Sequence, residues 1–343
     1  MEKLLTSYFF NIVVFTLFNL LSFVIINYYK NKIFSSLVDM PDNLRKFHSK
    51  PVLLIGGVFV AIYLAIISFY YYFNDRNEIF LISTISLTIF FVGLVDDYLS
   101  INAYKKLFFI SSILLIALNF YNEINIQTLY FSTFDKNFEL GKLSLFFTTL
   151  CILLLINTLN LSDGINGLAV GISIIWLSFL LFKENSDLEI ILVPLIFLLI
   201  LIFTFIYQEK FFLGDNGSLV LSSFIGLIVV YIYNQNLDNE STKISSENIF
   251  ILFMVPGIDM FRLFVERLLK KKNPFKGDRN HLHHFLINKF SLKITLMIYF
   301  FTIFFFIILD DLKIVKSAYL IISYTCIYIL SIIYLKKSYF KRL

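Results

Sequence analysis

Carboxylate side chains stand at two places where long apolar runs of this sequence end. Asp96 and Asp97 occur in FVGLVDDYLS, and Asp215 lies between glycines in FLGDNGSLV. Adjacent carboxylates can bind a divalent cation or act as a general base. A Gly-Asp-Asn-Gly turn at a helix N-terminus suits a phosphate–metal site, because backbone amides and the helix dipole favour anions. The alternatives are solvation of a helix end for the pair, and a turn with Ser218 as helix cap for the second segment.

The segment NTLNLSDGINGLAVG offers further oxygen atoms. Asn157 and Asn160 are spaced i, i+3, so a helix would place them on one face. Asp163 and Asn166 each precede a glycine, which predicts two turns. Capping of helix ends is the alternative, but it does not require the asparagine pair before the turns. We interpret the segment as a loop that brings oxygen ligands to one end of the neighbouring helices.

Three of the four histidines, His281, His283 and His284, occur in NPFKGDRNHLHHF beside Arg279. A zinc site is one alternative, but the spacing is unlike HExxH, the segment lacks cysteine, and the basic residues would repel a cation. An incidental basic loop is the other alternative. Imidazole and guanidinium groups directed at a diphosphate fit this neighbourhood better.

Basic residues also accompany two other polar segments. Arg45, Lys46 and His48 precede the apolar run that begins at residue 51, and Lys105 and Lys106 follow the aspartate pair. A turn before a membrane helix would explain the nearby prolines and glycines, but it does not demand the Arg-Lys-x-His string. The lysines could neutralise a phosphate.

The rest of the chain must hold these segments, and its composition requires a membrane. Hydrophobic residues make up 58% of the 343 residues and charged residues 15%, with a mean hydropathy of +0.80. Soluble domains are typically near half apolar and a quarter charged. A spanning helix needs about 20 apolar residues, and open sheets cannot exist in lipid. We predict an all-α bundle of eleven transmembrane helices over 4–29, 51–73, 79–95, 104–121, 143–160, 167–182, 189–207, 217–233, 247–265, 293–309 and 317–335.

The distribution of lysine and arginine predicts the orientation of this bundle. One set of alternating loops carries 20 of the 29 basic residues. Positive loops face the cytoplasm, so the N-terminus is expected outside and the C-terminus in the cytoplasm. The net charge of +5 therefore reflects topology and gives no reason to expect nucleic acid as a partner. We expect one membrane domain over 1–343, with its active site formed by the cytoplasmic loops 30–50, 96–106, 157–166, 208–216 and 266–292.

Taken together, carboxylates, amides and basic donors on one face indicate phosphoryl or pyrophosphate chemistry. In such reactions the protein mainly positions the reactants and neutralises their charge. A site at the membrane–cytosol boundary could join a soluble phosphorylated donor to a lipid acceptor. The residues alone thus predict a metal-dependent transferase that acts on a membrane lipid.

The order of these motifs resembles a known family. RKxH…PxxxxGG, DDY, NxxNxxDGxxGLA, FxGDxGS and PFxxDRxHxHHFL, spread over residues 39–290, are similar to the polyprenyl-phosphate N-acetylhexosamine-1-phosphate transferases of glycosyltransferase family 4. The HxHH loop and the RKxH string are closer to the WecA/TagO-like branch, which starts O-antigen, common antigen or teichoic acid chains, than to MraY of peptidoglycan synthesis. The resemblance also implies an eleven-helix bundle in the cytoplasmic (inner) membrane and allows a homodimer.

The resemblance implies a reaction and roles for the residues. A UDP-N-acetylhexosamine, by default UDP-GlcNAc, would give its sugar-1-phosphate to undecaprenyl phosphate and release UMP, with Mg²⁺ or alternatively Mn²⁺. Asp215 would be the principal metal ligand and Asn160 a second one. Asp96 or Asp97 would deprotonate or orient the lipid phosphate, by direct attack or through a covalent intermediate, and Asp163 would shape the nucleotide pocket. The remaining candidates, for substrate binding, are Arg45, His48, Lys106, Asn157, Asn166, Arg279, His281, His283 and His284.

One position departs from the family pattern. Most bacterial members read DGxDG, whereas this chain has Asn166 in place of the second aspartate. Asparagine keeps an oxygen and gains a donor but loses the negative charge. We expect an active enzyme with an altered donor preference. Three alternatives remain: the phospho-MurNAc-pentapeptide transferase of the same family, a transporter of phosphorylated solutes and an inactive scaffold.

Overall fold

The computed structural model describes residues 37–39, 51–74, 76–183, 188–237, 243–274 and 279–340. The expected first span, 4–29, lies outside the described residues, as do Arg45, Lys46 and His48. Loop 30–50 is therefore described only at residues 37–39.

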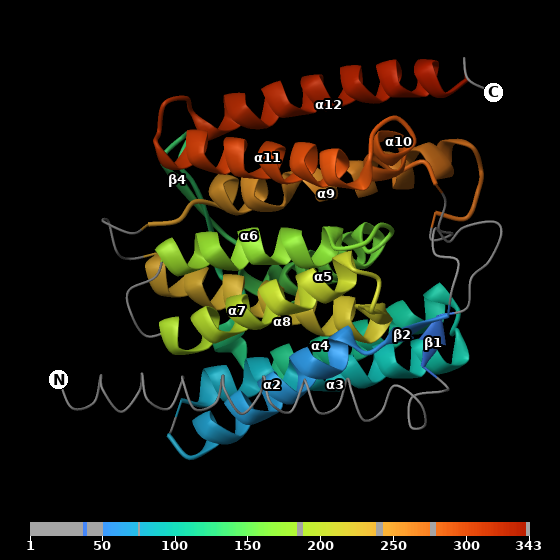
Figure 1. The fold of residues 1–343 in the computed structure, drawn as a ribbon. Coiled ribbons are helices and arrows are strands. Elements are labelled where there is room, and N and C mark those ends of the chain that lie inside the picture. Colours follow the sequence, from blue (N-terminus) through green and yellow to red (C-terminus); the bar gives the residue numbers. More distant parts are fainter. Residues whose placement is uncertain are drawn as a thin grey trace. The chain divides into compact units, whose positions relative to one another are not determined.

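Apolar helices dominate the described part of the chain (Figure 1). Eight are long and apolar enough to cross a membrane, and two more, α2 (Gly56–Tyr72) and α6 (Leu168–Lys183), are apolar but shorter. The ten coincide with the ten expected spans that follow the first, so the polytopic all-α fold is confirmed. The eight long helices are α3 (Asn77–Leu99), α4 (Ala103–Phe120), α5 (Ser144–Ser162), α7 (Glu189–Tyr207), α8 (Gly214–Asn236), α9 (Ser246–Leu269), α11 (Leu292–Asp311) and α12 (Ser317–Phe340).

The chain divides into two compact units. The first comprises residues up to Asn102 together with Ala169–Ile225, and the second comprises Ala103–Leu168 and Gly226–Leu343. Helix α8 therefore contributes its first half to one unit and its second half to the other.

In the first unit, a small sheet accompanies the helices. Strands β1 (Val38–Asp39), β2 (Val52–Leu54) and β5 (Phe211–Phe212) lie in the order β1-β2-β5. β1 is antiparallel to β2, and β2 is parallel to β5, with Leu53 opposite Phe211. The amide of Gly57 also donates to the carbonyl of Leu213 at 3.1 Å. The sheet thereby ties the start of α2 to the start of α8, an arrangement that the hydropathy pattern does not reveal.

The second unit contains α4, α5, α9, α11, α12 and the short helix α10 (Leu282–Ile287), with α9 packed against both α11 and α12 (Figure 1). It also carries a hairpin, β3 (Thr128–Phe131) and β4 (Lys136–Glu139), and two short 3₁₀ helices at Asn122–Ile124 and Gly141–Leu143. The carboxylate of Glu247, in the first turn of α9, accepts the amide hydrogens of Ser132 and Thr133 at 3.0 Å each. The hairpin is thus held to the N-terminal end of α9.

Candidate functional site

In the first unit, Asp97 and the start of α8 form one hydrogen-bonded arrangement. Asp97 lies in the last turn of α3, and its Oδ1 accepts the amide hydrogen of Asp215 at 2.9 Å. Its Oδ2 accepts the amide hydrogen of Asn216 at 2.8 Å. A carboxylate at this place satisfies two of the unpaired amides of a helix N-terminus and complements the helix dipole. Asp97 therefore caps α8 from a different helix and fixes the backbone of Asp215.

This arrangement corrects two expectations from the sequence. The helix begins at Gly214, three residues before the expected span, so Asp215 lies in its first turn instead of in a preceding loop. Ser218 is fully buried inside the helix, where its hydroxyl donates to the carbonyl of Asp215 at 3.3 Å, so it is not the cap. The sequence does not reveal the cap because it comes from a residue more than a hundred positions away.

Glycines allow the helices to approach this closely. Gly214 has φ of +79°, and a Cβ there would lie 2.9 Å from Asp97 Oδ2. Gly93 lies on α3 one turn before Asp97, and a Cβ at that position would lie 2.5 Å from the Cα of Asn216. Real Cβ atoms do not approach a backbone this closely. The glycines in FVGL and FLGD are thus steric requirements of the contact between α3 and α8.

Asn216 is a further residue of this arrangement that sequence reasoning did not select. Its Nδ2 donates to the carbonyl of Leu54 at 3.1 Å and also to Asp97 Oδ2. Leu54 is the last residue of β2, so one buried amide joins the sheet, α3 and α8. The only signal in the sequence is its place directly after Asp215 in the Gly-Asp-Asn-Gly string.

The carboxylates of this unit are of the type that holds Mg²⁺. Asp97 and Asp215 are half-buried, and their negative charges act on each other. Mg²⁺ is typically bound by one or two carboxylates with waters and substrate phosphates, and a cation would relieve the repulsion of the pair. In the described ranges, no group of three or more histidine, cysteine, aspartate or glutamate side chains is arranged so that it could hold a metal ion. The donors therefore fit a hard cation completed by substrate oxygens, and not a closed structural metal site. Asp96, beside them on α3, is buried.

In the second unit, the three histidines form a buried cluster. His281, His283 and His284 are 4%, 1% and 8% exposed. The rings of His281 and His283 are stacked with centroids 5.4 Å apart, and those of His283 and His284 are 4.3 Å apart. Burial, reinforced by the two neighbouring imidazoles, holds the pKa of His283 well below its usual value, so this ring is neutral at pH 7. An exposed basic loop is not what the structure shows at these three positions.

The Asp163–Gly167 turn lies against this cluster. A Cβ at Gly164 would be 2.7 Å from Nε2 of His283 and 3.2 Å from Nε2 of His284. Asp163 is the C-cap of α5, and its amide donates a hydrogen bond to the carbonyl of Asn160 at 3.2 Å. The structure thus brings together two motifs that are more than a hundred residues apart, and the glycine after Asp163 is what permits the approach.

Other predicted site residues of this unit are placed less centrally. The Nδ2 of Asn157 donates to Sδ of Met260 at 3.3 Å, so this side chain faces α9. Asn160 lies in the last turns of α5, and Asn166 lies half-buried in the turn before α6. Lys106 lies in the first turns of α4, and Arg279 is exposed just before the histidines.

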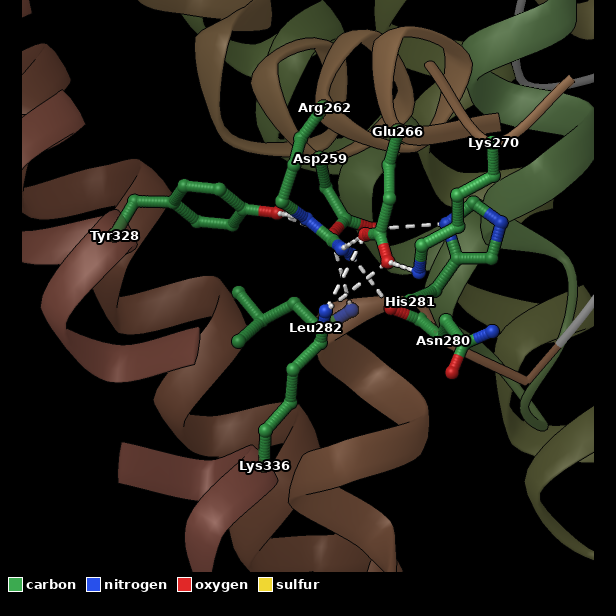
Figure 2. Close-up of polar contacts among 9 residues, drawn as sticks. All are labelled: Asp259, Arg262, Glu266, Lys270, Asn280, His281, Leu282, Tyr328 and Lys336. Atoms are coloured by element: carbon green, nitrogen blue, oxygen red, sulfur yellow. Dashed lines mark hydrogen bonds and ion pairs between the residues drawn. The ribbon is translucent and has the colours of Figure 1, made fainter. Parts of the chain in front are cut away.

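A group of polar side chains on α9 and α12 supports the histidine loop (Figure 2). His281 Nδ1 lies 2.8 Å from Asp259 Oδ2, and the amide of Leu282 donates to Asp259 Oδ1 at 3.0 Å. Arg262 donates to the carbonyl of Asn280 and to Asp259. Sequence reasoning missed Asp259 as a site residue, although an ionisable side chain inside the apolar run 247–265 is a signal that could have found it.

Comparisons with known proteins agree with the motif pattern. The family model described as glycosyl transferase family 4 matches residues 79–233. A protein of Bacillus subtilis (strain 168) named "Probable undecaprenyl-phosphate N-acetylglucosaminyl 1-phosphate transferase" is 27% identical over 302 residues, covering 86% of this chain and 82% of that protein. Two proteins named undecaprenyl-phosphate alpha-N-acetylglucosaminyl 1-phosphate transferase are also similar. The one from Thermotoga maritima is 28% identical over 77% of each chain, and the one from Escherichia coli (strain K12) is 27% identical over 73% of this chain and 69% of its own.

The matched region contains Asp96, Asp97, Asp163 and Asp215, and the similarity to the relatives extends over most of both chains. Motifs, helices and relatives therefore agree. The chain is similar to glycosyl transferase family 4 over residues 79–233, and to relatives named undecaprenyl-phosphate N-acetylglucosaminyl 1-phosphate transferase over most of its length.

Proposed function

We propose that the protein transfers N-acetylhexosamine-1-phosphate, by default GlcNAc-1-phosphate, from a UDP-sugar to undecaprenyl phosphate and releases UMP. The observation that carries this proposal is the buried histidine cluster packed on the Asp163–Gly167 turn, in a chain that is similar to glycosyl transferase family 4. The names of the relatives supply the acceptor lipid and the transferred sugar phosphate. An enzyme that starts a lipid-linked envelope polysaccharide would use both the acceptor lipid and the sugar phosphate.

We propose that the second unit binds the UDP-sugar donor. The Nε2 atoms of His281 and His283 are buried and have no hydrogen-bond partner among the described residues. Buried polar atoms normally have partners, so these nitrogens are suited to the diphosphate or the sugar of the donor. Asp163 and Asn166 would shape the nucleotide pocket beside them. Neutral Asn166 in place of a charged residue would act on donor preference.

We propose that the aspartates at the end of α3 and the start of α8 bind the metal ion and position the lipid acceptor. Asp215 would be the principal Mg²⁺ ligand, with Asn160 as a second, and the ion would neutralise phosphate charge during transfer. The two hydrogen bonds that Asp97 accepts from the backbone amides of Asp215 and Asn216 support a positioning role for this residue toward Asp215. Asp96 then remains the candidate that orients the lipid phosphate. Arg45, His48, Lys106, Asn157 and Arg279 remain candidates for substrate contacts.

The site is proposed to face the cytoplasm from the inner membrane, because 20 of the 29 basic residues lie in the loop set that carries the motifs. A nucleotide-activated sugar is a cytosolic compound in this scheme. The whole chain would act as one transferase domain, as a monomer or a homodimer.

The experiment is UMP release by the purified protein with undecaprenyl phosphate and Mg²⁺ across a panel of UDP-sugars. Turnover with one UDP-N-acetylhexosamine is expected. Turnover with UDP-MurNAc-pentapeptide alone would move the protein to the peptidoglycan branch. Absence of UMP release with every donor, from protein shown to be folded, would overturn the proposal.

A further inference from the structure

Asp259 is the centre of a polar group buried between α9, α12 and the start of α10 (Figure 2). Its side chain is 3% exposed. Oδ1 accepts from the amide of Leu282 at 3.0 Å, from the hydroxyl of Tyr328 at 2.6 Å and from Nη2 of Arg262 at 3.1 Å. Buried charge is costly unless it is paired and hydrogen-bonded, and here a guanidinium and two neutral donors converge on the carboxyl. Asp259 is therefore an ionised carboxylate.

The second oxygen of Asp259 determines the state of His281. Because an ionised carboxylate only accepts hydrogen bonds, Nδ1 of His281, 2.8 Å from Oδ2, must carry a hydrogen. The ring's other nitrogen, Nε2, is buried and has no hydrogen-bond partner among the described residues. The carboxylate thus fixes both the tautomer and the direction of the ring, as acidic partners of functional histidines do.

The three histidines differ in what surrounds them. His283 is held neutral, because burial and its imidazole neighbours lower its pKa. His281 has the Asp259 carboxylate on one side, at 2.8 Å. A ring with its hydrogen on Nδ1 can donate to a phosphate oxygen from Nε2 only when both nitrogens carry hydrogens, and the Asp259 carboxylate is the anion that balances this form. The contact with Asp259 therefore makes His281 a member of the cluster that is suited to a phosphate group.

We propose that Asp259 is the positioning residue of this site: it holds His281 so that Nε2–H donates to a phosphate oxygen of the nucleotide donor. Tyr328 and Arg262 support it, since Arg262 Nε donates to the Tyr328 hydroxyl, which in turn donates to Asp259. Arg262 also holds the carbonyl of Asn280, the residue before His281. This inference rests on the proposed function for the identity of the donor, and it involves a hydrogen bond without proton transfer to substrate.

The test compares Asp259→Asn with Asp259→Ala. Asparagine keeps the shape and can still accept from Leu282 and Tyr328, but its NH₂ group would face Nδ1 of His281 and move the ring hydrogen to Nε2, which leaves no carboxylate to balance an imidazolium. We expect kcat/KM for the UDP-sugar to fall on the order of 10- to 100-fold in both variants, as for carboxylates that orient metal-bound histidines. The KM for undecaprenyl phosphate should not change. If Asp259 only held the fold together, asparagine would restore activity that alanine loses.

A double variant shows whether Asp259 acts through His281. Residues that act as one unit are not additive, so Asp259→Asn should cost nothing further in a His281→Gln background. Glu266→Gln is the matched control, because Glu266 belongs to the same group on α9, bonded to Arg262 at 3.0 Å, but does not contact His281. The control should keep wild-type kinetics. Full additivity, or near wild-type donor kinetics in Asp259→Asn, would overturn the inference.

Failure of the proposed function would be recognised separately. If the wild-type protein released no UMP with any UDP-sugar, the binding of UMP and UDP-GlcNAc would be measured by calorimetry on the same variants. A loss of UMP affinity of about 10-fold or more in Asp259→Asn, absent in Glu266→Gln, would retain the positioning role for Asp259 toward a nucleotide phosphate. Equal affinity in all variants, or no binding by the wild type, would remove it.

Discussion

The two polar regions of this protein use an aspartate in different ways. In the first unit, Asp97 accepts backbone amides of the first turn of α8, and glycines let the two helices touch. In the second unit, Asp259 accepts mostly from side chains, and it orients one of them, His281. A site fixed by backbone contacts tolerates little added volume, whereas a site fixed by side chains depends on their charge and hydrogen bonds. Substitutions should therefore affect the two regions in different ways.

The largest effect is expected at Asp215. Asp215→Ala removes the proposed principal metal ligand, and loss of several kcal/mol of charge stabilisation corresponds to about a 10³-fold or greater fall in UMP release. Asp97→Asn should be nearly as severe, because an NH₂ group would then face an amide N–H of α8. Both proteins should still insert into membranes and keep their melting temperature within a few degrees. Near wild-type turnover in either variant would remove that residue from the site.

The next largest effect is expected from adding a methyl group at a glycine, which should lower stability in the first region and not in the second. Gly93→Ala puts a methyl group 2.5 Å from the backbone of α8, and overpacking of this kind costs roughly 1–3 kcal/mol. Gly257→Ala on α9 is the matched control, since nothing lies within 4 Å of its Cβ, and alanine there should be neutral or stabilising by up to about 1 kcal/mol. Thermal unfolding in detergent measures both, and equal melting temperatures would contradict the close contact of α3 with α8.

A dependence on pH is expected from the histidine cluster. The pKa of His283 is lowered in the folded protein, so the unfolded chain binds a proton more readily as the pH falls below about 6.5. Stability should then decrease by up to about 1.4 kcal/mol per pH unit on acidification from that value. His283→Asn should reduce this slope between pH 7 and pH 5, which melting curves at several pH values would show. An unchanged slope would mean that burial of His283 is not what governs this range.

The smallest effect is expected at the edge of the polar group on α9. Glu266 pairs with Lys270 at 2.6 Å and with Lys336 at 3.3 Å in a partly exposed position. Such pairs typically contribute about 0.2–1 kcal/mol, so Glu266→Gln should lower stability slightly and leave UMP release unchanged. A large kinetic defect would mean that the polar group acts as a whole and not through Asp259.

Individual segments show how far sequence reasoning reached. The apolar runs located ten of the ten helices that can be compared, because a bilayer requires about 20 apolar residues whatever the neighbours are. The predicted helix ends were less accurate. Helix α8 begins at Gly214 and α3 continues to Leu99, so Asp215 and Asp97 both lie inside helices. The short sheet of β1, β2 and β5 was not expected, since strands of two or three residues have no periodic signal.

For the site residues, too, the sequence identified which residues matter but not which contacts they make. The motifs selected Asp97, Asp215 and the three histidines without any structure, because their residue types limit the chemistry. The motifs could not reveal that Asp97 caps α8, that Gly164 touches His283, or that Asp259 holds His281. Each of these contacts depends on how segments that are not adjacent in the chain pack together, and the motif pattern carries no information on that packing.

The sequence by itself determined that this is a polytopic helical membrane protein and which polar segments bear its chemistry, because hydropathy and residue type are local properties. Only the tertiary structure decided which atoms are engaged and which are left for a substrate. Hydrogen bonds such as those of Asp97 and Asp259 act over about 3 Å, and that proximity is created by packing between helices.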